Sequence, residues 1–198
     1  MCPSVTKAEA AARPPLPSRL TSGLVQVDVT TAMDNSERSA SVSADRAGMA
    51  AALRAARAGI ATGQSPFGCA IGRNGRVLIA SHNTVWRDTD PTRHAEVNAI
   101  SAACRKLGSI YLSGCTLYAT CEPCPMCFSA AHWARVSRAV FGASIADARA
   151  AGFNELVIPA RDLKRLGRHR IELVSGFMAE ECRALFAEWQ KAGKCGAY

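Results

Sequence analysis

The sequence lacks any apolar run long enough to cross a membrane, because Arg, Gly or Ser interrupts each run well before the roughly 18 residues that a span requires. Its N-terminus also lacks the charged start, apolar stretch and small-residue cleavage site of a secretory signal. Its nine cysteines are an odd number and cannot all pair within one chain. These absences favour a soluble protein of the reducing cytoplasm over a membrane protein or a secreted, disulfide-held one.

Size and charge set further limits. The 198 residues suit one domain with a hydrophobic core and tails. The formal net charge of +8 at pH 7 comes mostly from arginines scattered among alanines, and we interpret it first as a solvated helical surface. One local cluster, RDLKRLGRHR at residues 161–170, keeps a nucleic-acid partner as the second interpretation.

The first 45 residues differ from the rest. Prolines break any helix in AARPPLPSRLTSG, and TTAMDNSERSASVSADR is polar, so neither stretch buries enough apolar surface to offset its ordering entropy. We expect residues 1–45 to form a mostly disordered tail, with Leu24–Val29 as a candidate edge strand. Met33 and Met49 are alternative translation starts. The folded domain then spans residues 46–198.

From Asp45 onward the pattern becomes regular. DRAGMAAALRAARAGIATG predicts a helix that begins at an Asp45 cap and ends at Gly63, and Asn74-Gly75 predicts the turn of a β-hairpin. The segments that follow are helical in TRHAEVNAISAACRKLG, CPMCFSAAHWARV and MAEECRALFAEWQKAG, and extended in GCTLYAT, RAVFGAS and RIELVSG. This alternation after a hairpin predicts an α/β fold with a mixed sheet covered by helices.

The seven residues CEPCPMC, 121–127, raise the question of metal binding. Cys124 and Cys127 lie at a predicted helix start, with Pro125 near the first helical position. Two thiols three residues apart point the same way, and the helix N-terminus favours their thiolate forms. By itself the pair fits a redox motif or half of a structural zinc site equally well.

His94-Ala95-Glu96 supplies the other half of a site. One His and two Cys give three zinc ligands and leave an open position, which is typical of catalytic zinc. Such a zinc lowers the pKa of a bound water toward 7, and the nearby Glu96 can carry a proton without binding the metal. A nonenzymatic zinc module would have no use for this acid, so metal-assisted hydrolysis is favoured.

The residues His94-Ala95-Glu96 and Pro123-Cys124-Pro125-Met126-Cys127 match the H-x-E and P-C-x-x-C signature of the zinc-dependent base deaminases. Over residues 46–198 the chain resembles the cytidine deaminase-like superfamily, and within it the bacterial guanine deaminases. The further matches are PFG, DPTRHAEVNAI, TCEPCPMC, WARV, AAGFNE and the terminal Tyr198. The resemblance implies a three-layer α-β-α fold and a homodimer that exchanges its C-terminal segment, about residues 176–198.

The resemblance also assigns roles to residues. It implies one Zn²⁺ per subunit on His94, Cys124 and Cys127, with Glu96 as the proton shuttle. It implies that a small purine base is held by Phe67, Asn83, Trp133, Glu155 and Tyr198.

The residue type at position 155 bears on the substrate. An ionised Glu155 would accept from the N1–H of guanine and repel the bare N1 of adenine. Glu155 stands where the family is expected to have an aspartate. We therefore predict hydrolysis of guanine to xanthine and ammonia. Two alternatives stay open: a tRNA adenosine deaminase, which needs a basic RNA-binding surface, and a deaminase of another aminated ring such as cytosine, a triazine or guanosine.

The remaining cysteines and histidines have no partner at metal spacing. We interpret the cysteines as packed residues and the histidines as surface or locally hydrogen-bonded residues; they are Cys69, Cys104, Cys115, Cys121, Cys182, His82, His132 and His169.

Overall fold

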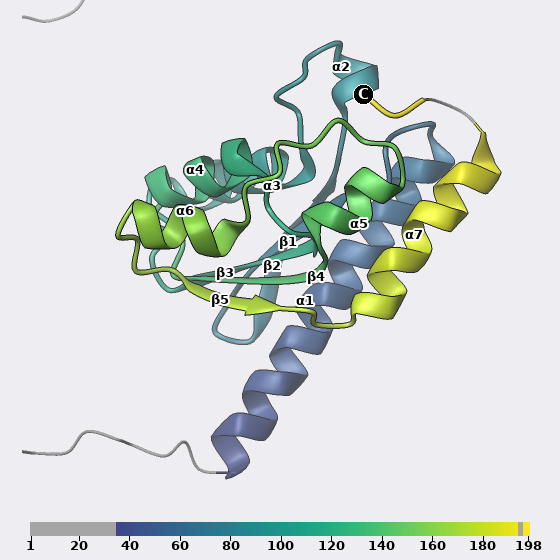
Figure 1. Cartoon of the computed structure of the whole chain (residues 1–198). Helices are drawn as coiled ribbons and strands as arrows, with labels where there is room; N and C mark the ends of the chain where they lie inside the picture. The colour runs from purple at the N-terminus through teal and green to yellow at the C-terminus, as the bar shows by residue number, and fades with distance from the viewer. Residues whose placement is uncertain (1–34, 194–195) are drawn as a thin grey trace, which may run out of the picture. The chain divides into compact units, whose positions relative to one another are not determined.

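A computed structural model describes residues 35–193 and 196–198 of the chain. The predictions for residues 1–34, including the strand at Leu24–Val29, lie outside these residues. The described part contains five strands and seven helices (Figure 1).

The strands form one mixed sheet in the order β2-β1-β3-β4-β5. β1 is antiparallel to both β2 and β3, whereas β4 is parallel to both β3 and β5. Their bounds are Gly68–Arg73 for β1, Arg76–His82 for β2, Cys115–Cys121 for β3, Arg138–Ala143 for β4 and Glu172–Ser175 for β5. The predicted α/β class and mixed sheet are confirmed.

The predicted hairpin is present between β1 and β2. Asn74 and Gly75 have φ angles of 51° and 73°, the left-handed values that a two-residue hairpin turn of this type requires at both positions. Arg73 and Arg76 face each other across the turn.

Helices cover both faces of the sheet. α1 and α7 pack together on one face, and α3, α4 and α6 lie on the other (Figure 1). The bounds are Asn35–Ala61 for α1, Val85–Asp88 for α2, Ala95–Leu107 for α3, Pro125–Trp133 for α4, Ile145–Ala150 for α5, Ala160–Leu166 for α6 and Ala179–Ala192 for α7. The predicted three-layer α-β-α arrangement is confirmed.

Alternating strand residues divide the core into two layers. Ile71 and Leu117 belong to the cluster under α3 and α4, while Ala70 and Val140 belong to the cluster under α1 and α7. At Gly68 a Cβ atom would collide with the carbonyl oxygen of Ala52 in α1. The missing side chain lets α1 approach the start of β1 directly.

Helix α1 begins at Asn35, ten residues before the Asp45 start that we predicted, so residues 35–45 are helical and not part of a tail. Asp45 is 4% exposed and accepts from Arg138 Nη1 at 2.6 Å and Nη2 at 2.9 Å. Extending an existing helix costs little. The Arg138 side chain, 93 residues away in sequence, holds Asp45 at the sheet. Among the described helices, including the 27-residue α1, none is long and apolar enough to cross a membrane.

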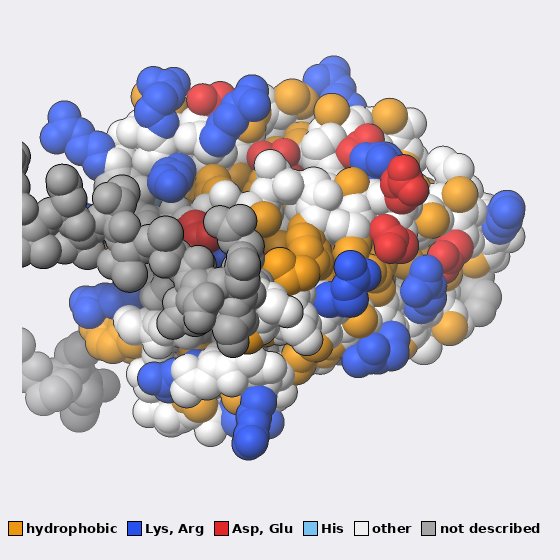
Figure 2. Space-filling model, turned by 90° about the horizontal axis from the view of Figure 1, so that it is seen from below, with side chains coloured by type: hydrophobic (Ala, Val, Ile, Leu, Met, Phe, Trp, Pro, Cys, Tyr) orange, Lys and Arg blue, Asp and Glu red, His pale blue; other side chains and the backbone are white. Residues whose placement is uncertain are grey.

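On the face that Figure 2 shows, Lys and Arg side chains are spread among acidic and apolar side chains and form no continuous stripe. This distribution is the one that we expect of a solvated helical surface.

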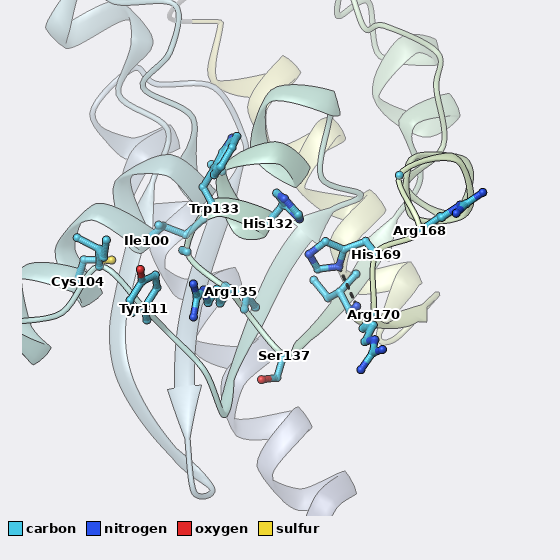
Figure 3. A pocket seen from close by; sticks show the side chains of 16 residues that line it. Ile100, Cys104, Tyr111, His132, Trp133, Arg135, Ser137, Arg168, His169 and Arg170 are labelled. Carbon is cyan, nitrogen blue, oxygen red and sulfur yellow. Dashed lines mark hydrogen bonds between the residues drawn. The ribbon is translucent and has the colours of Figure 1, made fainter. Parts of the chain in front are cut away.

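A hollow of about 1010 Å³ lies at the C-terminal end of α4. Trp133, Tyr111, Arg135 and His169 are among its lining residues (Figure 3). The Arg135 guanidinium sits 3.9 Å from the centre of the Tyr111 ring. The lining residues therefore combine aromatic rings with arginine.

Candidate active site

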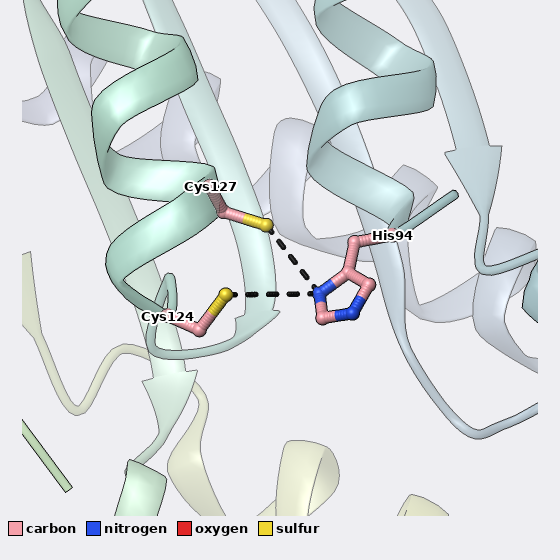
Figure 4. A group of neighbouring side chains, drawn as sticks. All are labelled: His94, Cys124 and Cys127. Atoms are coloured by element: carbon pink, nitrogen blue, oxygen red, sulfur yellow. Dashed lines mark hydrogen bonds between the residues drawn. The ribbon is translucent and has the colours of Figure 1, made fainter. Parts of the chain in front are cut away.

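The starts of α3 and α4 carry the predicted metal ligands. His94 is the N-cap residue of α3 and Cys124 is the N-cap residue of α4, and both have extended backbone angles. Neither side chain makes a capping hydrogen bond to its own helix. Instead the two side chains and Cys127 point toward one another, as Figure 4 shows. Pro125, the first residue of α4, has no N–H that would need a partner.

The distances within this group fit a zinc ion. The Sγ atoms of Cys124 and Cys127 lie 3.7 Å and 3.5 Å from His94 Nδ1, and the three ligand atoms all lie within 4.8 Å of one another. A zinc ion bonds to nitrogen at about 2.0–2.1 Å and to sulfur at about 2.3 Å, and at a tetrahedral angle these bonds place a nitrogen and a sulfur ligand about 3.6 Å apart. The donor set and its spacing therefore match a tetrahedral zinc with three protein ligands.

The charges of the metal-free group are arranged to receive a cation. The hydrogen bond from Cys127 lowers the pKa of Cys124 to about 4, despite burial, and His94 strengthens the effect. The same hydrogen bond, together with burial, raises the pKa of Cys127 well above its usual range. One thiolate is thus formed without metal, and binding of a divalent cation is expected to release the second proton.

Glu96 lies in the first turn of α3 and is 7% exposed. Its Oε2 atom is 3.4 Å from Cys127 Sγ, yet Glu96 is not a member of the ligand group. Burial raises the pKa of Glu96 to about 7, with the Cys124 thiolate adding to the shift and His94 opposing it. A carboxyl group with this pKa can both accept and donate a proton near neutral pH.

A pocket of about 260 Å³ opens in front of His94 and Cys124. Phe67, Glu155 and Tyr198, three of the residues for which the resemblance implies base binding, line it. Glu155 also lines the smaller space that borders Glu96. Burial raises the pKa of Glu155, the Cys124 thiolate adds to this shift, and His94 opposes it. The structure therefore brings three of the five predicted base-binding residues to one cavity beside the metal ligands.

Asn83 lies behind this pocket, where it is 1% exposed. Its Nδ2 atom donates to Tyr198 Oη at 2.6 Å, and its Oδ1 atom accepts from the N–H of Val85 at 3.1 Å. Asn154 N–H donates to the main-chain oxygen of Tyr198 at 3.1 Å. In the described chain, Tyr198 reaches the pocket of its own chain, and the exchange of residues 176–198 between subunits stays a prediction.

The prediction that Trp133 lines the base pocket is wrong. Trp133 is the last residue of α4, 76% exposed, and lines the separate hollow of Figure 3. It lies eight positions after Pro125 along the helix, a distance of about 12 Å at a rise of about 1.5 Å per residue. Only the N-terminal end of α4 faces the metal ligands.

Sequence reasoning missed Phe153 and Met126, which also line the pocket. The Phe153 ring packs edge-on against Phe67, with ring centres 4.8 Å apart. Their positions in the sequence could have indicated this. Phe153 is two residues from Glu155, and Met126 lies between the two cysteines.

A helix-borne His, a Cys pair three residues apart and a buried Glu beside them define a zinc site of the kind found in base deaminases. Residues 42–143 match the family model for the cytidine and deoxycytidylate deaminase zinc-binding region. The chain belongs to this family, and the predicted zinc cofactor is confirmed.

Two curated relatives carry different names. The chain is 45% identical over 93 residues to the guanine deaminase of Bacillus subtilis, a match that covers 47% of this chain and 60% of the relative. It is 35% identical over 150 residues to a tRNA-specific adenosine deaminase of Bacillus subtilis, over 74% of this chain and 91% of the relative. The chain therefore spans about three-fifths of the first of these relatives.

Solved structures give the same fold. A guanine deaminase from Nitrosomonas europaea superimposes with a TM-score of 0.68 at 32% identity, over 73% of this chain and 84% of the other. A mutant protein in complex with 8-azaguanine superimposes with a TM-score of 0.70 at 31% identity, over 76% and 86% of the two chains.

Proposed function

We propose that the protein is a zinc-dependent deaminase that hydrolyses guanine to xanthine and ammonia. The observation that carries this proposal is the position of Glu155, whose side chain lines both the pocket and the space beside Glu96. The similar structure with 8-azaguanine supports a guanine-sized ring as the ligand. The cytoplasm, as the location of free purine bases and reduced thiols, belongs to the same proposal.

In this proposal the base lies between the aromatic walls and the acids of the pocket. Phe67 and Phe153, which pack edge-on against each other, form one aromatic wall against the base, and Glu155 accepts from its N1–H. Adenine offers a bare acceptor at N1, so a buried carboxylate there would lose its partner and repel that ring. Glu155 thus supplies the discrimination between the two purines.

Zinc, when bound by His94, Cys124 and Cys127, supplies a Lewis acid that activates water for attack. Glu96 takes the proton of that water and gives it to a ring nitrogen while the oxygen bonds to C2. A second proton then passes through Glu96 to the departing amine, so guanine and water become xanthine and ammonia.

A second candidate is a tRNA adenosine deaminase. The tRNA-specific relative is matched over 91% of its length, and the basic segment 161–170 could face RNA. However, Arg168 and Arg170 line the hollow at the far end of α4 and are not among the residues that line the pocket. Another aminated ring of guanine size would fit the same cavity.

The test is ammonia release by the purified, zinc-loaded protein. Guanine, adenine and a tRNA anticodon stem-loop with a target adenosine are supplied separately. We expect release from guanine alone, and a Glu155→Gln variant should lose much of the preference for guanine over adenine. Release from the stem-loop alone would replace the proposal with RNA editing. The homodimer is tested in the same preparation by analytical ultracentrifugation.

A further inference from the structure

Glu122 connects the end of β3 with the starts of α5 and α6. It follows β3 directly, and its N–H donates to the carbonyl oxygen of Ala143 at 2.8 Å. Its Oε1 atom accepts from the N–H of Ala160 at 2.8 Å, and its Oε2 atom accepts from the N–H of Ile145 at 3.3 Å. Ile145 is the first residue of α5 and Ala160 is the first residue of α6. One carboxylate therefore holds the starts of both helices.

The N–H of Ala160 depends strongly on this contact. The N-cap residue of α6 is Pro159, whose side chain has no hydrogen-bonding group. Ala160 itself is 0% exposed, so water is poorly placed to replace the carboxylate. A first-turn N–H that has no intrahelical partner needs such an acceptor. At α5, Ser144 and Asp147 form a capping box, and Glu122 adds to a cap that is already satisfied.

The chain between these two anchors forms one side of the pocket. We call residues 145–160 the pocket segment. It carries Phe153, Asn154, Glu155 and Leu156, all of which line the pocket. Between Phe153 and Ala160, a single backbone hydrogen bond reaches another part of the described chain, from Asn154 N–H to Tyr198. Glu155 and the residues after it are therefore held by the buried Phe153 ring and the Asn154–Tyr198 hydrogen bond on one side and by the Glu122 anchor on the other.

Glu122 also lies two residues before Cys124. The same short connection between β3 and α4 thus carries a metal ligand and the anchor of the pocket segment. The hydrogen bond from Ala160 to Glu122 therefore resists movement of the pocket segment relative to Cys124. We propose that Glu122 is a positioning residue that fixes Glu155 relative to the metal ligands. The part of this inference that concerns substrate affinity rests on the proposed guanine deaminase function.

The main variant is Glu122→Gln, which preserves the shape of the side chain. It replaces one acceptor oxygen with an NH₂ group, so only one of the two N–H donors keeps its acceptor. Glu122→Ala removes both acceptors. The matched control is Glu172→Gln, because Glu172 is an exposed acid of β5 that pairs with Arg138 and lies outside the pocket segment.

Three quantities are measured on each zinc-loaded protein: zinc content, kcat and KM for guanine, and hydrogen–deuterium exchange of residues 145–160. We expect Glu122→Gln to keep one zinc and a kcat within about 3-fold of the parent, while KM rises roughly 10-fold or more and exchange accelerates. Glu122→Ala should enlarge both effects. Glu172→Gln should leave KM and exchange in the pocket segment unchanged.

Faster exchange without a change in KM would overturn the positioning role, because it would show a loose segment that still binds substrate. Unchanged exchange would overturn the anchor itself. If the parent protein does not act on guanine, the proposed function fails, and the exchange measurement still decides whether Glu122 anchors the segment. Loss of zinc in Glu122→Gln would also contradict the proposal, since the carboxylate would then act on the metal site.

Discussion

The phenol of Tyr198 and the side-chain amide of Asn83 form a 2.6 Å hydrogen bond across 115 residues of sequence. The last residue of the chain thereby becomes part of the pocket wall. Its ring also packs edge-on toward His94, with ring centres 6.0 Å apart. Tyr198 contacts both a metal ligand and a proposed substrate-binding residue. Substitution or removal of Tyr198 therefore tests whether this cavity is the active site.

We expect removal of residues 196–198 to reduce kcat/KM for guanine by roughly 10- to 100-fold, because one wall of the pocket is lost. The thermal unfolding midpoint should change little, since these residues contribute few core side chains. Tyr198→Phe, which removes only the hydroxyl, should cost about 2- to 10-fold, the worth of one hydrogen bond. Full activity of the shortened protein would exclude Tyr198 from the site.

Cys124→Ala should reduce zinc binding strongly, because two protein ligands cannot complete the site. The matched control is Cys121→Ala, a buried cysteine three residues earlier that lies outside the ligand group. Metal analysis after dialysis should find close to one zinc in the control and far less in Cys124→Ala. Equal metal content in the two variants would contradict the ligand assignment.

Glu96→Gln should retain zinc and lose kcat by about 10²- to 10⁴-fold, because the amide cannot accept and return a proton. The variant keeps the size of the buried side chain and is expected to fold. Steady-state kinetics beside metal analysis of the same sample separate the two effects. A variant with normal turnover would remove the proton-shuttle role.

The pKa of Glu96 also predicts a pH dependence of stability. In the metal-free protein burial raises this pKa from 4.5 to about 7, so the native state keeps a proton that the unfolded chain has released. The contribution of Glu96 to the unfolding free energy is fully present below pH 4.5 and is lost as pH rises through about 7, with a size of the order of 3 kcal/mol.

The contribution of the Cys124 thiolate to the unfolding free energy changes with pH in the opposite direction, because its pKa is lowered. The measured quantity is therefore the difference in unfolding free energy between chelated wild type and Glu96→Gln. The wild type should lose stability relative to the variant across this pH range, and a constant difference would contradict the shift.

Trp133→Ala should leave KM for guanine unchanged, because the side chain lies in the hollow at the other end of α4. Phe67→Ala provides the comparison, since Phe67 lines the pocket and should raise KM. Kinetics of the two variants under the same conditions decide the point. A similar rise in KM for both would return Trp133 to the site.

Local patterns predicted much of this protein. The period of apolar residues, the Asn74-Gly75 turn and the cysteine spacing depend only on neighbouring residues, and each has its expected place in the fold. The predicted start of α1 was ten residues too late. The ion pair that holds Asp45 to Arg138 joins residues far apart in sequence, and no local pattern indicated it. Trp133 was misplaced because a resemblance motif says which helix a residue is on, and the direction that each end of the helix faces depends on tertiary packing.

His94 and Cys124 occupy the N-cap positions of two helices without capping them. An N-cap side chain ordinarily contributes about 1 kcal/mol by accepting a hydrogen bond from the first turn, and that contribution is absent here. The metal that these residues bind provides stabilisation in its place, and its size depends on mass action, growing with the ratio of free zinc to the dissociation constant. The unfolding free energy of this protein should therefore rise with the concentration of free zinc.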